Sequence, residues 1–318
     1  MSVDTSSRRG TRDGGATPAG RRPKATDRAR QEARLGWYLA GPAFVILVAV
    51  TGYPILQALY DSLWSYRLTA PADREFIGLR NYGVILTDPL WLSSLANTVL
   101  ITVVTVAVEL VLGFALAMVM HKVLGWLRPI VRTAILVPYA IITVVSAYAW
   151  QYAFGLTTGF MNAVLNLDDF DWFANKWTAL LVICLSEIWK TTPFISLLLL
   201  AGLAQVPEDM HEAAKVDGAT AWERLWKVTL PNMKASIMVA LLFRALDAFR
   251  IFDNVFIMTK GAADTETVSF LAYNQTISRL EIGLGSAVSV LLFVCVIVIC
   301  FIAIKVFKVD LARARGES

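Results

Sequence analysis

The chain has 318 residues, of which 57% are hydrophobic and 17% are charged, and its formal net charge is +4. Soluble domains are about a quarter charged, so this composition excludes an ordinary soluble domain. The apolar residues are concentrated in blocks of about twenty or more, the length that a helix needs to cross a hydrocarbon core about 30 Å thick. We therefore expect an all-α integral membrane protein surrounded by membrane lipid.

Residues 1–34 are rich in Arg, Gly, Ser and Thr and poor in apolar residues. Such a composition predicts a disordered, basic cytoplasmic tail. Its basic residues either bind anionic lipid headgroups or serve only as a signal for membrane orientation. The apolar block that follows is too long for the core of a signal peptide, so we expect no cleavage. A short cytoplasmic tail is also expected at residues 309–318.

Six apolar blocks predict a six-helix transmembrane domain at residues 35–308. They run from about Trp37 to Leu63, Thr98 to Met120, Ile130 to Phe154, Thr178 to Leu203, Ala235 to Met258 and Gly283 to Val306. With the N-terminus inside, about twenty Lys and Arg residues lie in cytoplasmic segments and six lie in outer segments. Because cytoplasmic loops carry the excess of basic residues, both termini are expected in the cytoplasm.

A long cytoplasmic loop, residues 205–234, joins the fourth block to the fifth. Its acidic first turn predicts a short helix, and Asp217-Gly218 predicts the end of that helix. The small side chains of Ala213 and Ala214 permit close approach of another surface. A second apolar turn follows and carries Trp222 and Trp226. The loop is therefore either a helix-turn-helix element that projects from the membrane or an amphipathic connector that lies on the inner leaflet.

The fifth block contains four charged residues, each of which would cost about 3 kcal/mol if it faced lipid. They are Arg244, Asp247, Arg250 and Asp253. At about 100° per residue, one stripe of this helix collects Phe243, Asp247, Arg250 and Asn254, and the fourth block presents a similar stripe with Glu187, Thr191 and Phe194. Planar polar groups beside a flat ring suit a sugar, whose hydroxyls need paired hydrogen bonds.

These charged residues also have a purely structural interpretation. Asp247 and Arg250 would then form an ion pair between helices that fixes the bundle. We expect Arg244 and Asp253 to be packing pairs in either case. Glu109, which is isolated in the second block, is expected to be a buried hydrogen-bonding anchor rather than a proton relay.

The run Glu212-Ala213-Ala214-x-x-Asp217-Gly218-Ala219, followed about ten residues on by Thr229-Leu230-Pro231, resembles the EAA loop. This loop marks the permease subunits of binding-protein-dependent ABC importers, and the similarity covers roughly residues 38–305. Matches to the sugar branch of the family lie at 76–82, at Asn97-Thr98 opening the second helix, and at 187–194, 249–253 and 285–287. One departure is Thr259-Lys260-Gly261-Ala262-Ala263, where the family usually has Thr-Gly-Gly-Gly-Pro. The shape of this outer loop is left open.

The resemblance implies the type I ABC importer permease fold and transport of a sugar by alternating access across the bacterial cytoplasmic membrane. A disaccharide such as trehalose is expected; maltose, other α-glucosides and glycerol 3-phosphate are the alternatives. The residues implied in coupling to an ATPase are Glu212, Ala213, Ala214, Asp217, Gly218 and Ala219. Those expected at the substrate are Glu187, Thr191, Phe194, Phe243, Asp247, Arg250 and Asn254. The implied partners are a second permease, two ATPase subunits that bind ATP and Mg, and an extracytoplasmic sugar-binding lipoprotein.

Two other function classes fit the residues less well. A proton-coupled secondary transporter would use Asp247, Glu187 and Glu109, but it predicts paired inverted repeats, which the sequence does not show. A membrane enzyme acting on lipid-linked sugars would need catalytic acids at the interface, whereas these acids lie within the apolar blocks. No Gly-x-x-x-x-Gly-Lys-Ser/Thr run is present. We therefore expect no catalytic residues, metal or cofactor in this chain, and no nucleic-acid partner.

Overall fold

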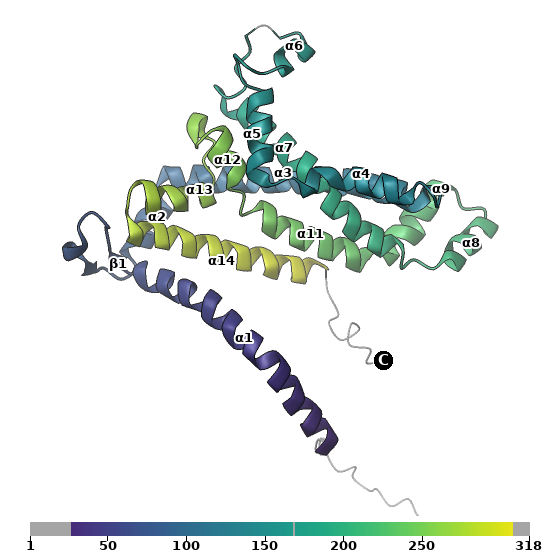
Figure 1. The fold of residues 1–318 in the computed structure, drawn as a ribbon, viewed down its shortest axis with the longest axis horizontal. Coiled ribbons are helices and arrows are strands. Elements are labelled where there is room, and N and C mark those ends of the chain that lie inside the picture. The colour runs from purple at the N-terminus through teal and green to yellow at the C-terminus, as the bar shows by residue number, and fades with distance from the viewer. Residues whose placement is uncertain (1–26, 168, 308–318) are drawn as a thin grey trace, which may run out of the picture. The chain divides into compact units, whose positions relative to one another are not determined.

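The computed structural model describes residues 27–167 and 169–307, and helices dominate it (Figure 1). The helices are α1 (Asp27–Asp61), α2 (Arg80–Thr87), α3 (Pro89–Lys122), α4 (Arg128–Ala140), α5 (Thr143–Ala153), α6 (Met161–Leu165), α7 (Lys176–Leu203), α8 (Glu208–Val216), α9 (Ala221–Arg224), α10 (Leu230–Asn232), α11 (Lys234–Ala248), α12 (Asp253–Met258), α13 (Val268–Tyr273) and α14 (Ile282–Phe307). The strands β1 (Trp64–Ser65) and β2 (Glu75–Phe76) form one antiparallel pair. The expected all-α class is confirmed.

The chain divides into two compact units between Ile55 and Leu56, and every element after α1 belongs to the second unit. Helix α1 begins at Asp27. Residues 1–26 of the expected basic tail lie outside the described residues, as does the expected tail at 309–318.

Within the residues that the structure describes, four helices are long and apolar enough to cross a membrane: residues Arg34–Asp61 of α1, α3, α7 and residues Ile282–Lys305 of α14. Helices α4 and α5 pass the same test only as a pair, and they are bent by 84° at the break between them. The expected fifth block is divided into α11 and α12 by a break at residues 249–252. The third and fifth of the six expected helices are therefore broken rather than continuous.

Helix α3 begins nine residues before the expected start of the second block, so the prediction that Asn97-Thr98 opens this helix is wrong. The start is set by Asp88, whose side chain accepts a hydrogen bond from the backbone N–H of Leu90 at 2.9 Å. Pro89 at the first helical position fits this arrangement because its missing N–H would have no partner there. Asn97 and Thr98 are instead buried on one face of α3.

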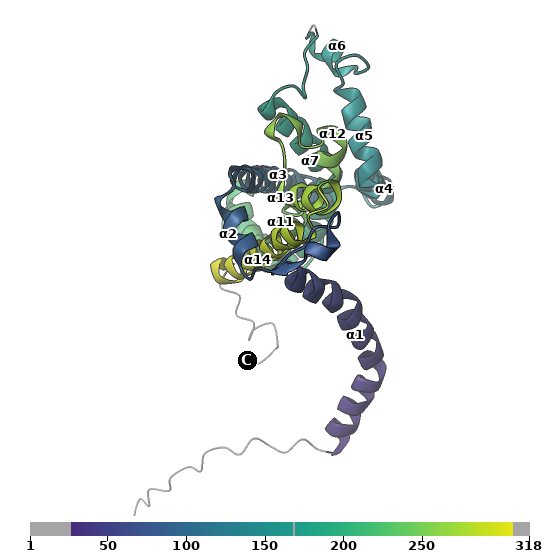
Figure 2. The same ribbon diagram turned by 90° about the vertical axis from the view of Figure 1, so that its left-hand side faces the viewer.

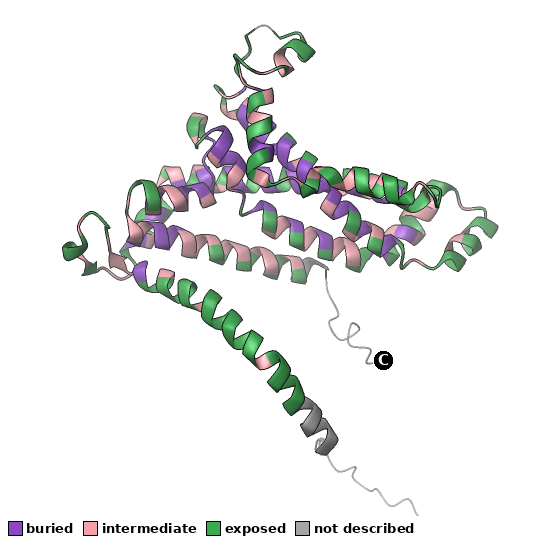
Figure 3. Cartoon of the chain, viewed as in Figure 1, coloured by how far each residue is buried: buried purple, intermediate pink, exposed green. Residues whose placement is uncertain are grey.

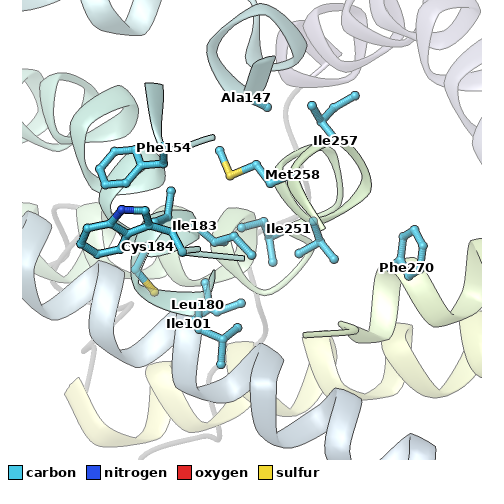
Figure 4. Close-up of a cluster of buried hydrophobic side chains, with 13 residues drawn as sticks. Ile101, Ala147, Phe154, Leu180, Ile183, Cys184, Ile251, Ile257, Met258 and Phe270 are labelled. Carbon is cyan, nitrogen blue, oxygen red and sulfur yellow. The ribbon is translucent and has the colours of Figure 1, made fainter. Parts of the chain in front are cut away.

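The core of the second unit lies along α3 and α7, which run side by side (Figure 1 and Figure 2). In α7, 67% of the most apolar stretch is buried, against 33% in α3, so α7 is the more central helix (Figure 3). One buried cluster joins α3, α5, α7, α12 and α13 through Ile101, Ala147, Ile183, Ile257 and Phe270 (Figure 4). This cluster packs the short helix α12 against α5 and α7.

Candidate functional site

A polar cavity of about 450 Å³ lies where α4, α5 and α7 meet the break between α11 and α12. The cavity is lined by Tyr139, Thr143, Glu187, Lys190, Thr191, Asp247, Arg250, Ile251, Phe252, Asp253 and Asn254. Five of the seven substrate residues expected from sequence, Glu187, Thr191, Asp247, Arg250 and Asn254, lie around this one space. The two helical stripes are thus brought together.

The two expected aromatic residues lie elsewhere. Phe243, one turn before Asp247, is 56% exposed and does not line the cavity. Phe194 stacks on Tyr139 with ring centroids 5.5 Å apart. Phe194 therefore packs against a residue that lines the cavity and does not line it itself. Tyr139 is the aromatic side chain that α4 contributes to the lining.

The polar residues beside the cavity form one network centred on Arg244, which is fully buried. Its Nε donates to Oε2 of Glu109 at 2.5 Å and its Nη2 donates to Oε1 of Glu187 at 2.6 Å. Its Nη1 donates to Oδ2 of Asp247 at 2.5 Å. One guanidinium therefore joins carboxylates from α3, α7 and α11. Arg244 is the centre of this network, rather than a residue that pairs with one neighbour to pack the bundle.

Glu187 connects the two sides of the break in the fifth crossing. Its Oε1 accepts from Arg244 on α11, and its Oε2 accepts from Nδ2 of Asn254 on α12 at 2.7 Å. The hydroxyl of Thr267 donates to the backbone oxygen of Ile251 at 3.2 Å, so a carbonyl freed by the break has a partner. The break is thus held by side chains from other segments of the chain.

The alternative ion pair between Asp247 and Arg250 does not form. Asp247 pairs with Arg244, while Nε of Arg250 donates to the backbone oxygen of Leu246 at 3.1 Å. Glu109 is buried and accepts hydrogen bonds from Arg244 and from the hydroxyl of Thr191 at 2.7 Å, as expected of an anchor.

Six cavity residues were not among the predicted site residues: Tyr139, Thr143, Lys190, Ile251, Phe252 and Asp253. Lys190 is buried, and its Nζ lies 5.5 Å from the ring centroid of Tyr139, where it makes a cation–π contact. Thr143 starts α5 immediately after the bend. The sequence did contain two signals: a lysine, Lys190, within an apolar block, and a proline, Pro138, directly before Tyr139. Neither signal shows which cavity the side chain faces.

The loop 205–234 forms a hairpin of short helices at the end of α7. In α8 no residue is buried, and Glu212, Ala213, Asp217 and Gly218 are all exposed. The helix ends in a Schellman motif: the N–H of Ala219 bonds to the oxygen of Ala214 at 2.9 Å, and the N–H of Gly218 bonds to the oxygen of Lys215 at 3.0 Å. Gly218 has φ +78°, the left-handed conformation that this motif requires.

The second half of the hairpin is fixed to this turn. Thr220 and Glu223 form a reciprocal capping box that starts α9. Hydrogen bonds from the backbone and the hydroxyl of Thr220 lower the pKa of the exposed Glu223 carboxyl. Nη1 of Arg224 donates to the backbone oxygen of Ala219 at 2.9 Å. A groove of about 330 Å³ runs between the two halves, and Ala214, Asp217, Gly218 and Ala219 line one side of it.

The loop after α12, which is expected on the outer side of the membrane, has four residues in left-handed conformations. Lys260, Gly261, Ala263 and Asp264 all have φ between 51° and 75°. Nδ2 of Asn97 donates to the backbone oxygen of Asp264 at 2.8 Å, which ties the loop to α3. These contacts settle the loop shape that the sequence left open.

Residues 109–309 match the family described as the binding-protein-dependent transport system inner membrane component. The chain is 52% identical over 276 residues to the trehalose transport system permease protein SugA of Mycobacterium tuberculosis, with 87% of this chain and 89% of the relative covered. It is 34% identical over 282 residues to the trehalose/maltose transport system permease protein MalF of Thermococcus litoralis, with coverage of 87% and 94%.

A chain in the crystal structure of a bacterial alginate ABC transporter, in complex with an alginate pentasaccharide-bound periplasmic protein, has the same fold. Its TM-score is 0.74 at 19% identity, with 87% of this chain and 94% of that chain covered.

Proposed function

The chain belongs to the family of binding-protein-dependent transport system inner membrane components, and from this membership we propose that it is the permease subunit that carries a disaccharide such as trehalose through an ATP-driven importer. The observation that carries the proposal is the cavity at the break between α11 and α12. Polar side chains from α4, α5, α7, α11 and α12 converge on this space.

The chemistry of the cavity favours a neutral, hydroxyl-rich ligand. Its lining has three carboxylates, from Glu187, Asp247 and Asp253, against two cations, from Lys190 and Arg250. A volume of about 450 Å³ falls in the range of about 300–1,000 Å³ that is usual for small-molecule sites. The carboxylates would repel a phosphate ester, which disfavours glycerol 3-phosphate. Trehalose is the first candidate because the relative at 52% identity is named as a trehalose permease.

The hairpin α8–α9 supports coupling to an ATPase subunit. A short helix with no buried residue and with small side chains at Ala213 and Ala214 offers a surface that another protein can approach closely. The Schellman turn and the bond from Arg224 to Ala219 make this surface rigid. In the proposed mechanism, ATP and Mg bind to two partner ATPase subunits, their closure moves the hairpin, and the cavity opens alternately to each side of the membrane.

The proposal places the chain in the bacterial cytoplasmic membrane, with both termini in the cytoplasm, beside a second, similar permease. An extracytoplasmic sugar-binding lipoprotein would deliver the substrate. The alginate transporter, which was solved with its periplasmic protein, has a chain of the same fold and so supports this arrangement.

The test is uptake of labelled trehalose into proteoliposomes that contain this chain with its partner permease, ATPase subunits and binding protein. We expect uptake that requires ATP and is competed by unlabelled trehalose more strongly than by maltose or glycerol 3-phosphate. Uptake that persists without the ATPase subunits would favour the secondary transporter instead. Glu212→Ala should abolish uptake and release the ATPase during purification, whereas Asp209→Ala, an exposed acid one turn earlier, is the matched control.

A further inference from the structure

We propose that Arg244 and Glu109 are positioning residues of the sugar site: they hold the carboxylates of Glu187 and Asp247 in place without touching the sugar. This inference rests on the proposed function, because it concerns how the cavity presents its acidic groups. Neither Arg244 nor Glu109 lines the cavity, and both side chains are 0% exposed. Any effect that they have on the substrate must therefore act through other side chains.

The contacts of Arg244 leave it little freedom. A guanidinium has five N–H donors in a fixed planar arrangement. Four of these five N–H groups donate hydrogen bonds. Two bind Glu109, through Nε to Oε2 at 2.5 Å and Nη2 to Oε1 at 3.2 Å; one binds Glu187 and one binds Asp247. The two-point contact with Glu109 fixes the plane of the guanidinium. That plane in turn fixes where the carboxylates of Glu187 and Asp247 lie.

The exposure of these side chains increases stepwise toward the cavity. The Glu109 and Arg244 side chains are fully buried, that of Glu187 is 9% exposed and that of Asp247 is 66% exposed. Both oxygens of Glu187 already accept hydrogen bonds, from Arg244 and from Asn254. Asp247 uses only Oδ2, and among the described residues its Oδ1 accepts no hydrogen bond. Asp247 is thus the member of the network with an oxygen to offer to a sugar hydroxyl.

The charges of the network predict the direction of an effect. One guanidinium is shared by three carboxylates from three helices, so each carboxylate competes with the others for it. If Glu109 loses its charge, Arg244 attracts Glu187 and Asp247 more strongly. Because Nη1 of Arg244 and Oδ2 of Asp247 are already 2.5 Å apart, the released guanidinium and the Asp247 carboxylate shift together. The carboxylate then leaves its position in the cavity, and sugar binding weakens although no residue that lines the cavity has changed.

The test is Glu109→Gln in the reconstituted importer, assayed for both assembly and the sugar concentration at half-maximal uptake. Gln keeps the shape and one acceptor oxygen, so we expect normal assembly. The half-maximal concentration should rise about tenfold, which corresponds to about 1.4 kcal/mol. Glu266→Gln is the matched control, because Glu266 is 8% exposed and lies outside the network. It should leave the half-maximal concentration unchanged.

A second variant keeps the test decisive if the first one fails to assemble. Arg244→Gln combined with Glu109→Gln removes both buried charges and still allows one hydrogen bond between the two amides. We expect this double variant to assemble and to show a raised half-maximal concentration. A wild-type half-maximal concentration in either assembled variant would overturn the inference. So would loss of assembly in both, because the pair would then serve only to stabilise the bundle.

Failure of the inference is distinguishable from failure of the proposed function. If the unmodified importer takes up no sugar, the proposed function fails before any variant is tested. If it takes up sugar and Glu109→Gln leaves the half-maximal concentration unchanged, only the positioning role is lost.

Discussion

Gly218, at the turn between α8 and α9, allows a sharp test of the coupling hairpin. Its φ is +78°, and a Cβ built on it has no atom within 4 Å. Gly218→Ala would therefore meet no steric obstacle in the isolated chain. The cost comes only from the left-handed backbone, about 1–2 kcal/mol for an L-residue. That corresponds to a shift of about 5–30-fold in the ratio of intact to opened turns.

The assay is ATP hydrolysis by the reconstituted importer in the presence of sugar-loaded binding protein, measured together with sugar uptake. If the intact turn is what the ATPase engages, Gly218→Ala should lower both rates, by at most about 5–30-fold, the change in the ratio of intact to opened turns for a penalty of this size. Gly218→Asn is the matched control, since Asn adopts the left-handed conformation at a lower cost than Ala. It should keep most of the activity despite its larger side chain.

Two results would refute this reasoning. Wild-type rates for Gly218→Ala would mean that the geometry of the turn does not matter for coupling. Equal loss in the Ala and Asn variants would mean that a side chain of any kind obstructs a partner, so that close approach, rather than backbone conformation, is what requires glycine here.

Three further predictions concern the cavity, the packing of the bundle and the outer loop. Asp247→Ala should raise KM for uptake about 10–150-fold while leaving assembly intact, because a hydrogen bond to a charged group contributes about 1.5–3 kcal/mol. Gly113→Ala should lower the thermal stability of the complex by about 1–3 kcal/mol, because the new Cβ would lie 2.6 Å from Cγ2 of Ile195. The hydrogen bond from Lys176, 2.5 Å long, lowers the pKa of Asp264 below its usual 3.8. The stability that it contributes is therefore present above about pH 4 and is lost as the pH falls through the lowered pKa. Asp264→Asn should abolish this loss in thermal melts recorded between about pH 2 and pH 5.

Each of these has an outcome that contradicts it. Loss of assembly in Asp247→Ala would assign that carboxylate to the bundle instead of the substrate. For the packing prediction the control is Gly83→Ala, where no atom lies within 4 Å of the new Cβ; equal melting of the Gly113 and Gly83 variants would show that the close contact relaxes freely. An unchanged acid profile in Asp264→Asn would show that another group controls the outer loop.

The turn between α8 and α9 could be predicted from sequence, because its determinants are local. Asp217-Gly218 signals the end of a helix, and the Schellman turn forms at that step. The residues involved are separated by at most five positions, so no knowledge of the tertiary structure was needed. Whether this hairpin couples the chain to an ATPase stays a prediction.

The cavity could be predicted only in part, since helical periodicity gives the direction of a side chain relative to its own helix and not to its neighbours. It placed Asp247, Arg250 and Asn254 on one stripe, and the structure brings them to one space. The link between Glu109 and Arg244, 135 residues apart, depends on how α3 and α11 are rotated against each other. No pattern within either helix contains that information.

The break at residues 249–252 was missed for a related reason. The run Phe249-Arg250-Ile251-Phe252 has neither proline nor glycine, so its composition gives no signal for a helix end. The partners that stabilise the break lie on other segments: Glu187 binds Asn254, and Thr267 binds the carbonyl of Ile251. A continuous helix is the reasonable expectation from local sequence, and only the tertiary contacts favour the broken one.

The 84° bend between α4 and α5 constrains how this chain enters a bilayer. Helix α4 has 13 residues and α5 has 11, so at about 1.5 Å per residue each is under 20 Å long. Neither half reaches across a hydrophobic layer about 30 Å thick. The bent pair is therefore stable in lipid only where trapped water or a protein surface, such as that of α7, against which α4 and α5 pack, shields the corner.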